Sequence, residues 1–345
     1  MSAITPTPSL LHYMTTHHHH IIINPYVMKS SIYETKYLDL SSGRPVVMFC
    51  GPSQSSTLIS NAFLKALDMP FPKHLVKRSC PPEFLNPECN IRPQTVMSCF
   101  GTGSKKYYRN IWQSCSNESM TAVTSTLSTS NVGFTKDNFA NGKLLLDMHL
   151  RGFPVFVAHR LPQHTFPANI PMWYELIWDS FQEASAEELR RLPSGDHLVA
   201  LRSYAASQNS TTWNMGDKNV KACVAHYIHF WHLLTVARQH GIPHVQIETL
   251  LLAPTVADIT RVLNESHLCG SSGVDPASCH RIAETIIHDR NEKTHMHSDQ
   301  KSLVAGANFT AELYRQKEQK FLTTSCPNAL QELITFCRDN ISGCQ

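Results

Sequence analysis

The sequence has 345 residues, of which 42% are apolar and 17% are charged. This balance excludes a wholly disordered chain, which would combine low hydrophobicity with high net charge. The 30 Lys and Arg residues against 27 Asp and Glu residues leave a net charge of +3, so we expect no nucleic-acid partner, which would need a dense basic face. No stretch reaches the roughly 18 apolar residues that a membrane span needs.

The 11 cysteines include no C-x-x-C pair, so neither a zinc ribbon nor a compact disulfide framework is predicted. We expect reduced, mostly buried thiols and a cytoplasmic protein. Residues 1–43 are predicted to form an irregular leader, in which the histidine run 17–20 is a polar tail rather than a metal site. Residues 1–33 contain no acidic residue, which leaves organelle import open.

Residues 44–345 are predicted to form one domain that begins with a strand, a polar loop and a helix. Residues 45–50 are a continuous apolar run, typical of a buried strand, and helical spacing starts at Ser56. Residues 70–142 are irregular and are predicted to be a substrate-facing insertion. Regular patterns then predict strands at 154–158, 197–201 and 243–248, separated by helices at 172–191 and 217–240 and followed by helices at 255–266, 276–291, 310–322 and 328–339.

Strands that alternate with helices predict an α/β fold: an open parallel sheet with helices on both faces. Ligands bind such sheets beyond the carboxyl ends of the strands. The sequence places polar residues after three predicted strands, at 51–57, 159–164 and 202–210. Functional residues are therefore expected in these three segments.

The segment 51–57 follows the first strand and leads into a helix, where backbone N–H groups and the helix dipole favour an anion. A Walker A loop would place Gly at Ser56 and Lys at Thr57, so ordinary ATP or GTP hydrolysis is not expected. The alternative is a serine-rich turn that only caps the helix. In the segment 202–210, Arg202 is predicted to end a strand and to bind a phosphate together with Ser210, or else to form a surface ion pair.

In combination, these segments resemble the sulfotransferase family. Pro52-Ser53-Gln54-Ser55-Ser56-Thr57 is similar to its 5′-phosphosulfate loop, and Arg202 with Ser210 has the spacing of its 3′-phosphate site. Residues 245–254 and the Asn308-Phe309-Thr310 segment add looser similarity. The resemblance covers roughly residues 45–325 and implies a P-loop-NTPase-like three-layer sandwich.

It also implies 3′-phosphoadenosine 5′-phosphosulfate (PAPS) as sulfuryl donor, with no metal required, and a small-molecule or glycan acceptor. Ser56 and Thr57, helped by the backbone of Ser53, Gln54 and Ser55, would bind the 5′-phosphate. Arg202 and Ser210 would bind the 3′-phosphate, and Lys301 is a remnant of the family's late basic loop.

The chain departs from the family in its phosphate loop, where Ser53 replaces the basic residue and Ser55 the glycine. A lost cation weakens stabilisation of the leaving phosphate. Four cations are candidates to replace it, namely Arg44, Lys65, Arg160 and Lys301. The alternative hypothesis is a catalytically weak or inactive member of the fold that binds a nucleotide or a partner.

Some cytosolic members of the resembled family carry, after a strand, a histidine that deprotonates the acceptor hydroxyl. Strict spacing puts Arg160 at that position, so His159, one residue earlier, and His164, in the following loop, are the candidates. The alternative is that neither histidine is catalytic. Histidines 226, 229 and 232 recur every three residues on a predicted helix, and this spacing drifts around the helix. We therefore predict no metal site there.

Overall fold

The computed structural model describes residues 34–51, 56–70, 111–114, 116–129, 132–137, 140–165, 171–208, 216–270, 273–291 and 309–341. The described residues form a parallel sheet of four strands, β1 (Val46–Phe49), β2 (Phe134–Asp137), β3 (Val155–His159) and β4 (His244–Gln246), in the order β2-β1-β3-β4. In register, Phe49 pairs with Asp137 on one side and with Val157 on the other, and His159 pairs with Gln246. The predicted parallel sheet is confirmed.

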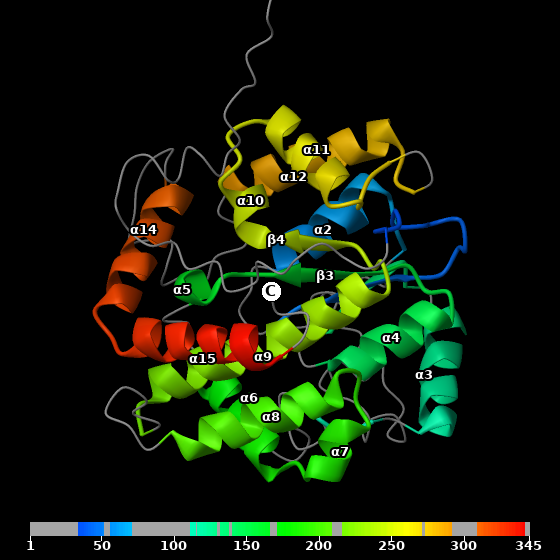
Figure 1. Cartoon of the computed structure of the whole chain (residues 1–345). Helices are drawn as coiled ribbons and strands as arrows, with labels where there is room; N and C mark the ends of the chain where they lie inside the picture. The colour runs from blue at the N-terminus through cyan, green and yellow to red at the C-terminus, as the bar shows by residue number, and fades with distance from the viewer. Residues whose placement is uncertain are drawn as a thin grey trace, which may run out of the picture.

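Helices cover both faces of this sheet (Figure 1). Val46 and Met48 of β1 point into an apolar cluster with α2 (Ser56–Ala66), α11 (Val256–Glu265) and α12 (Pro276–Asn291). Val47 and Phe49 point the other way, into a cluster with α4 (Gly142–Leu150), α6 (Pro171–Glu183) and α9 (Lys218–Gln239). Because side chains alternate along a strand, a strand buried on both faces must be apolar throughout, as β1 is. The α/β class with helices on both faces is therefore confirmed.

Helix α9 is the central helix of the second cluster, and sixteen of its residues are buried. Asp217 caps its start by accepting a hydrogen bond of 2.8 Å from the Asn219 N–H, and the chain leaves it through Gly241 at φ +64°. Such a left-handed conformation suits glycine, which has no Cβ. The helix packs on β3, and α8 (Gly195–Ser207) and α15 (Cys326–Asn340) pack against it. Residues of α3 (Asn117–Thr129) and α7 (Ala186–Arg190) belong to the same apolar cluster.

Three further helices lie at one end of the sheet. The chain leaves β3 into α5 (Pro162–Thr165) and leaves β4 into α10 (Ile247–Leu251), while α14 (Phe309–Leu322) packs against α5. Figure 1 shows these helices at the carboxyl ends of the strands. Residues from three distant parts of the chain therefore meet there.

The strand predicted at 197–201 is wrong, because these residues belong to α8. Leu198, Leu201 and Ala205 are its buried residues besides Gly195, and their spacing of three and four is helical. A short apolar run does not distinguish a strand from a buried helix by periodicity alone. β2 and α3 were not predicted, and both lie in the segment 70–142 that was predicted to be an insertion.

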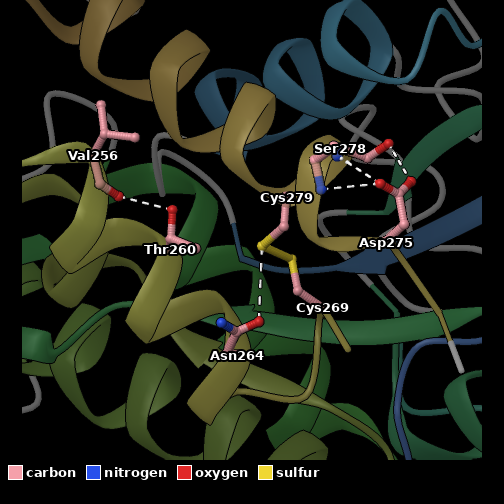
Figure 2. Close-up of a disulfide and its surroundings, with 8 residues drawn as sticks. Val256, Thr260, Asn264, Cys269, Asp275, Ser278 and Cys279 are labelled. Atoms are coloured by element: carbon pink, nitrogen blue, oxygen red, sulfur yellow. Dashed lines mark hydrogen bonds between the residues drawn. A yellow bond between two sulfur atoms is a disulfide. The ribbon is translucent and has the colours of Figure 1, made fainter. Parts of the chain in front are cut away.

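A disulfide joins Cys269, after α11, to Cys279 in the first turn of α12 (Figure 2). The prediction of reduced thiols is therefore wrong at these two positions, whereas Cys50, Cys223, Cys326 and Cys337 are buried thiols. Sequence separation alone did not reveal the bond, because the Cα atoms come within 5.9 Å only when α11 packs on α12. Disulfides persist mainly in oxidising compartments, so a cytoplasmic location stays a prediction that this bond does not favour.

Candidate functional site

The strand order places a topological switch point between β1 and β3. From β1 the chain first moves to β2 on one side, and it then returns past β1 to β3 and β4 on the other side. In open parallel sheets, ligands bind beyond the carboxyl ends of the two strands at such a point. The candidate site is therefore the region that follows Phe49 and His159.

The end of β1 is closely packed at Gly51. A Cβ built there would lie 2.6 Å from Cε2 of Phe230 and 2.9 Å from Oη of Tyr174, so the position needs glycine. Of the predicted phosphate loop, residues 52–55, including Ser53, Gln54 and Ser55, lie outside the described residues. Ser56 and Thr57 form the first two positions of α2. The structure thus confirms the strand and the helix on either side of the predicted loop.

A buried cluster of polar side chains follows β3. The Arg160 guanidinium donates a 2.5 Å hydrogen bond from Nη2 to the Tyr314 hydroxyl, and its Nε lies 3.9 Å from Oε1 of Glu248. The same carboxylate oxygen accepts a 2.9 Å bond from the Leu161 N–H and lies 3.2 Å from Nδ1 of His164. We call Arg160, His164, Glu248 and Tyr314 the Glu248 cluster.

The Glu248 cluster contains opposite charges that are both buried. Glu248 is 2% exposed and Arg160 is 5% exposed, so each charge needs the other. Burial raises the pKa of Tyr314 to about 12, which keeps its hydroxyl a neutral hydrogen-bonding group. Oε2 of Glu248 is buried and has no hydrogen-bond partner among the described residues. This oxygen is available to accept a hydrogen bond from a ligand.

Lys317 of α14 lies next to the cluster, and the pKa of its ammonium group is unusually low. Burial lowers its pKa to about 7, the positive charge of Arg160 lowers it further, and Glu248 opposes both effects. Near neutral pH the ammonium is therefore partly deprotonated. Since Glu248 balances Arg160, protonated Lys317 supplies the remaining positive charge of this group of residues.

The two candidate bases have different surroundings. The His159 side chain is 5% exposed, and burial together with nearby His244 and Arg238 lowers its pKa well below the usual value. An imidazole that is so weakly basic makes a poor proton acceptor. His164 instead faces the Glu248 carboxylate, which can hold one ring nitrogen as a donor and leave the other to accept a proton. The surroundings favour His164.

Arg202 is not at a strand end, so its predicted role as a phosphate ligand there is wrong. It lies on α8, and its Nη1 donates a hydrogen bond to the Ala184 carbonyl after α6. In Figure 1, α9 lies between α8 and the sheet. The spacing to Ser210 had suggested a strand followed by a turn, whereas α8 continues to Ser207. Ser210 and Lys301 lie outside the described residues.

Of the four candidate cations, the structure describes Arg44, Lys65 and Arg160. Among these three, only Arg160 lies at the carboxyl edge of the sheet. Arg44 precedes β1, stacks over Phe153 at 5.0 Å and donates to the Arg151 carbonyl, so it lies at the amino edge. Lys65 is in the last turn of α2 and pairs with Asp289 at 2.8 Å. Arg160 directly follows β3.

The histidines of α9 are structural groups inside the protein. His226 Nε2 lies 2.7 Å from the Arg160 carbonyl and His229 Nε2 lies 2.7 Å from the Ala140 carbonyl, whereas neither ring nitrogen of His232 has a hydrogen-bond partner among the described residues. Burial lowers their pKa values to about 3, 4 and 3 respectively. In the described residues, no group of three or more His, Cys, Asp or Glu side chains is arranged to hold a metal ion.

Comparison with protein-family models, with curated proteins and with solved structures finds no match for this chain. Among the helices in the described ranges, none combines the length and the apolar character that crossing a membrane requires. The functional assignment therefore depends on the motifs in the sequence and on the geometry at the carboxyl edge.

Proposed function

We propose that the chain binds PAPS at the carboxyl edge between β1 and β3 and transfers its sulfuryl group to a hydroxyl or amine of a small-molecule or glycan acceptor. The observation that carries this proposal is the switch point, which lies between the Gly51–Ser56 connection and the Glu248 cluster. The parallel sheet between helical layers supports the P-loop-like sandwich that the sulfotransferase resemblance implies.

The 5′-phosphate would bind the backbone between Gly51 and Thr57 at the start of α2, where the helix dipole favours an anion. Lys317 would supply the positive charge that the loop lacks at Ser53, since Glu248 already balances Arg160. Arg202 has no part in this assignment, because α8 holds it away from the strand ends.

The proposed transfer uses the His164–Glu248 pair as its base. The acceptor oxygen or nitrogen attacks sulfur, the bond from sulfur to the 5′-phosphate oxygen breaks, and the bisphosphate nucleotide leaves with that electron pair. His164 takes the acceptor proton on the ring nitrogen that does not face Glu248, and the carboxylate stabilises the resulting imidazolium. Glu248 is a positioning residue in this scheme, because it lies 3.2 Å from His164 Nδ1.

Binding without transfer is a second candidate function, favoured by two specific observations. The loop has Ser53 in place of a basic residue, and Arg202 donates to the Ala184 carbonyl on a helix remote from the loop. The missing basic residue and the remote position of Arg202 both leave less positive charge near the transition state. A protein of this kind would keep the fold and bind the nucleotide but transfer sulfate slowly or not at all.

Calorimetry with 3′-phosphoadenosine 5′-phosphate and with AMP tests the binding step. Binding of the first nucleotide is expected, and its advantage over AMP measures what the 3′-phosphate contributes. Lys317→Gln should weaken binding several-fold, whereas Lys320→Gln, exposed on the same helix, should not. If neither nucleotide binds to the purified chain, both candidate functions are wrong.

A sulfate-transfer assay against alcohols, phenols, amines and sugars then separates the two functions. His164→Gln should abolish transfer while leaving nucleotide affinity intact. The matched control is His280→Gln, because His280 also faces a carboxylate, Glu284 at 3.4 Å, but on the exposed surface of α12. Nucleotide binding without transfer would favour the second function.

A further inference from the structure

Two buried thiols meet where the C-terminal helix α15 packs on the central helix α9 (Figure 1). Cys223 lies in the second turn of α9, and Cys326 is the first residue of α15. These residues are 3% and 0% exposed and belong to the same apolar cluster. Their thiols hydrogen-bond to each other. The packing of two helices that are distant in the sequence therefore creates a pair of adjacent cysteines.

The two thiols of this pair differ in acidity. The hydrogen bond from the Cys223 thiol and a second one from the Thr324 side chain lower the pKa of Cys326, although burial and the negative charge of Asp217 oppose them. Burial, followed by the hydrogen bond to Cys326, raises the pKa of Cys223 well above its usual value. The thiolate is the reactive form of cysteine, so Cys326 is the nucleophile of the pair and Cys223 the proton donor beside it.

The position of Cys326 in the chain adds to this difference. The first N–H groups of a helix have no partner within the helix, and together with the helix dipole they favour a negative charge. The Cys326 N–H donates a 3.2 Å hydrogen bond to Oγ1 of Thr324. Thr323 is exposed, and Thr324 and Ser325 are half-buried. Opening of this turn therefore gives a small oxidant access to Cys326 while α9 stays folded.

A bond elsewhere in the chain shows that oxidised cysteines are compatible with this fold. Cys269 and Cys279 form a disulfide between α11 and α12. Disulfides persist mainly where the surroundings are oxidising, and the same surroundings act on every thiol that becomes accessible. The Cys223–Cys326 pair differs in that its two sulfur atoms interact as thiols.

We propose that Cys223 and Cys326 are a site of oxidation, at which a hydroperoxide converts the two thiols to a disulfide that joins α15 to α9. The Cys326 sulfur attacks a peroxide oxygen, the O–O bond breaks, and hydroxide leaves and takes up the proton that Cys326 released; Cys326 becomes a sulfenic acid. The Cys223 sulfur then attacks the Cys326 sulfur, the S–S bond forms, the S–O bond breaks, and water leaves with the Cys223 proton. The thiols lose two electrons, and hydrogen peroxide becomes two molecules of water. This site does not rest on the nucleotide site proposed above.

Peptide mapping of the full chain before and after hydrogen peroxide treatment, with alkylation under denaturing conditions, tests this proposal. We expect a linked peptide that contains Cys223 and Cys326 and is lighter than the two reduced peptides by two hydrogen atoms. Dithiothreitol should release it. The bond should also raise the thermal midpoint of unfolding, because it closes a long loop.

Cys223→Ala and Cys326→Ala should each abolish the linked peptide and the rise in the thermal midpoint. In Cys223→Ala, Cys326 should be oxidised to a sulfinic acid, because its resolving thiol is absent. Cys337→Ala is the matched control, since Cys337 lies on the same helix and is 1% exposed; it should keep both effects. Mapping of the wild-type chain decides the question even if a variant does not fold. If both cysteines are recovered as thiols, if either is linked to a different cysteine, or if wild-type Cys326 becomes a sulfinic acid without the link, the proposal is wrong.

Discussion

The Glu248 cluster can be compared with a cavity of about 330 Å³ at the outer edge of β4, whose described lining includes His159, Arg238, His244, Glu265 and His267 and which we call the β4-edge cavity. Both contain arginine, histidine and glutamate, but in different arrangements. At the carboxyl edge, the Arg160 guanidinium, the His164 imidazole and the Tyr314 hydroxyl surround one buried carboxylate. At the β4 edge, Arg238 and three imidazoles line a cavity, and Glu265, the acidic residue in its described lining, pairs with Arg261. In the first group the basic side chains face one buried carboxylate, whereas in the second they line a cavity next to one another. A buried charge needs a partner inside the protein, so the first group depends on Glu248.

Acidification should cause the largest loss of stability. It acts on the buried histidines of α9, which lie between the two regions. Their pKa values of about 3, 4 and 3 lie below the unfolded value near 6.5. The unfolded chain therefore binds protons first, and stability is lost as pH falls below about 6.5. At pH 5 each imidazole should cost about 2 kcal/mol, as measured by urea unfolding across pH.

His232→Leu should make this pH dependence shallower, because neither nitrogen of His232 has a partner among the described residues. His280→Leu, at an exposed position of α12, is the control and should leave the slope unchanged. A stability that stays flat between pH 7 and pH 5 would contradict the burial of these imidazoles.

Removal of a carboxylate should affect stability very differently in the two regions. Glu248→Gln leaves Arg160 buried without its counter-charge and should lower the free energy of unfolding by about 3–5 kcal/mol. Glu265→Gln changes an exposed side chain and should cost less than about 0.5 kcal/mol. Equal effects of the two variants in urea unfolding would mean that the Glu248 cluster is not buried as described.

The Cys269–Cys279 bond should support the β4-edge cavity more than the Glu248 cluster, because Cys269 lies two residues after His267, which lines that cavity. Replacing both cysteines by alanine should cost about 3 kcal/mol, since the bond closes a short loop. Nucleotide affinity at the carboxyl edge should be kept. If reduction with dithiothreitol leaves the urea midpoint unchanged, the bond is absent in solution.

The smallest expected effect is on nucleotide affinity as a function of pH. The pKa of Lys317 is about 7, so its positive charge is present below pH 7 and is lost above it. Affinity for 3′-phosphoadenosine 5′-phosphate should fall by up to about tenfold between pH 6 and pH 9, or about 1.4 kcal/mol. Lys317→Arg keeps its charge throughout and should remove the dependence, whereas Lys320→Arg should not.

Some sequence patterns predicted the helices and strands correctly, and others did not. Strand β1 and helix α9 were predicted because a continuous apolar run and a long helical repeat are local signals. Strand β2 was missed because Lys136 and Asp137 suggest an exposed segment, although both are 3% exposed. Arg202 was misplaced because five apolar and neutral residues before it fit a strand as well as a helix.

Local sequence patterns predicted the class of the fold, the strand and helix on either side of the predicted phosphate loop, and the two candidate histidines at and after the end of β3. The packing of distant elements was needed to show that Glu248 lies beside His164, that Arg202 belongs to an outer helix, and that Arg238 and His267 line one cavity. The reason is physical: Arg160 and Tyr314 are 154 residues apart. Periodicity reports the neighbours of a residue along one element, whereas a site joins side chains from several elements.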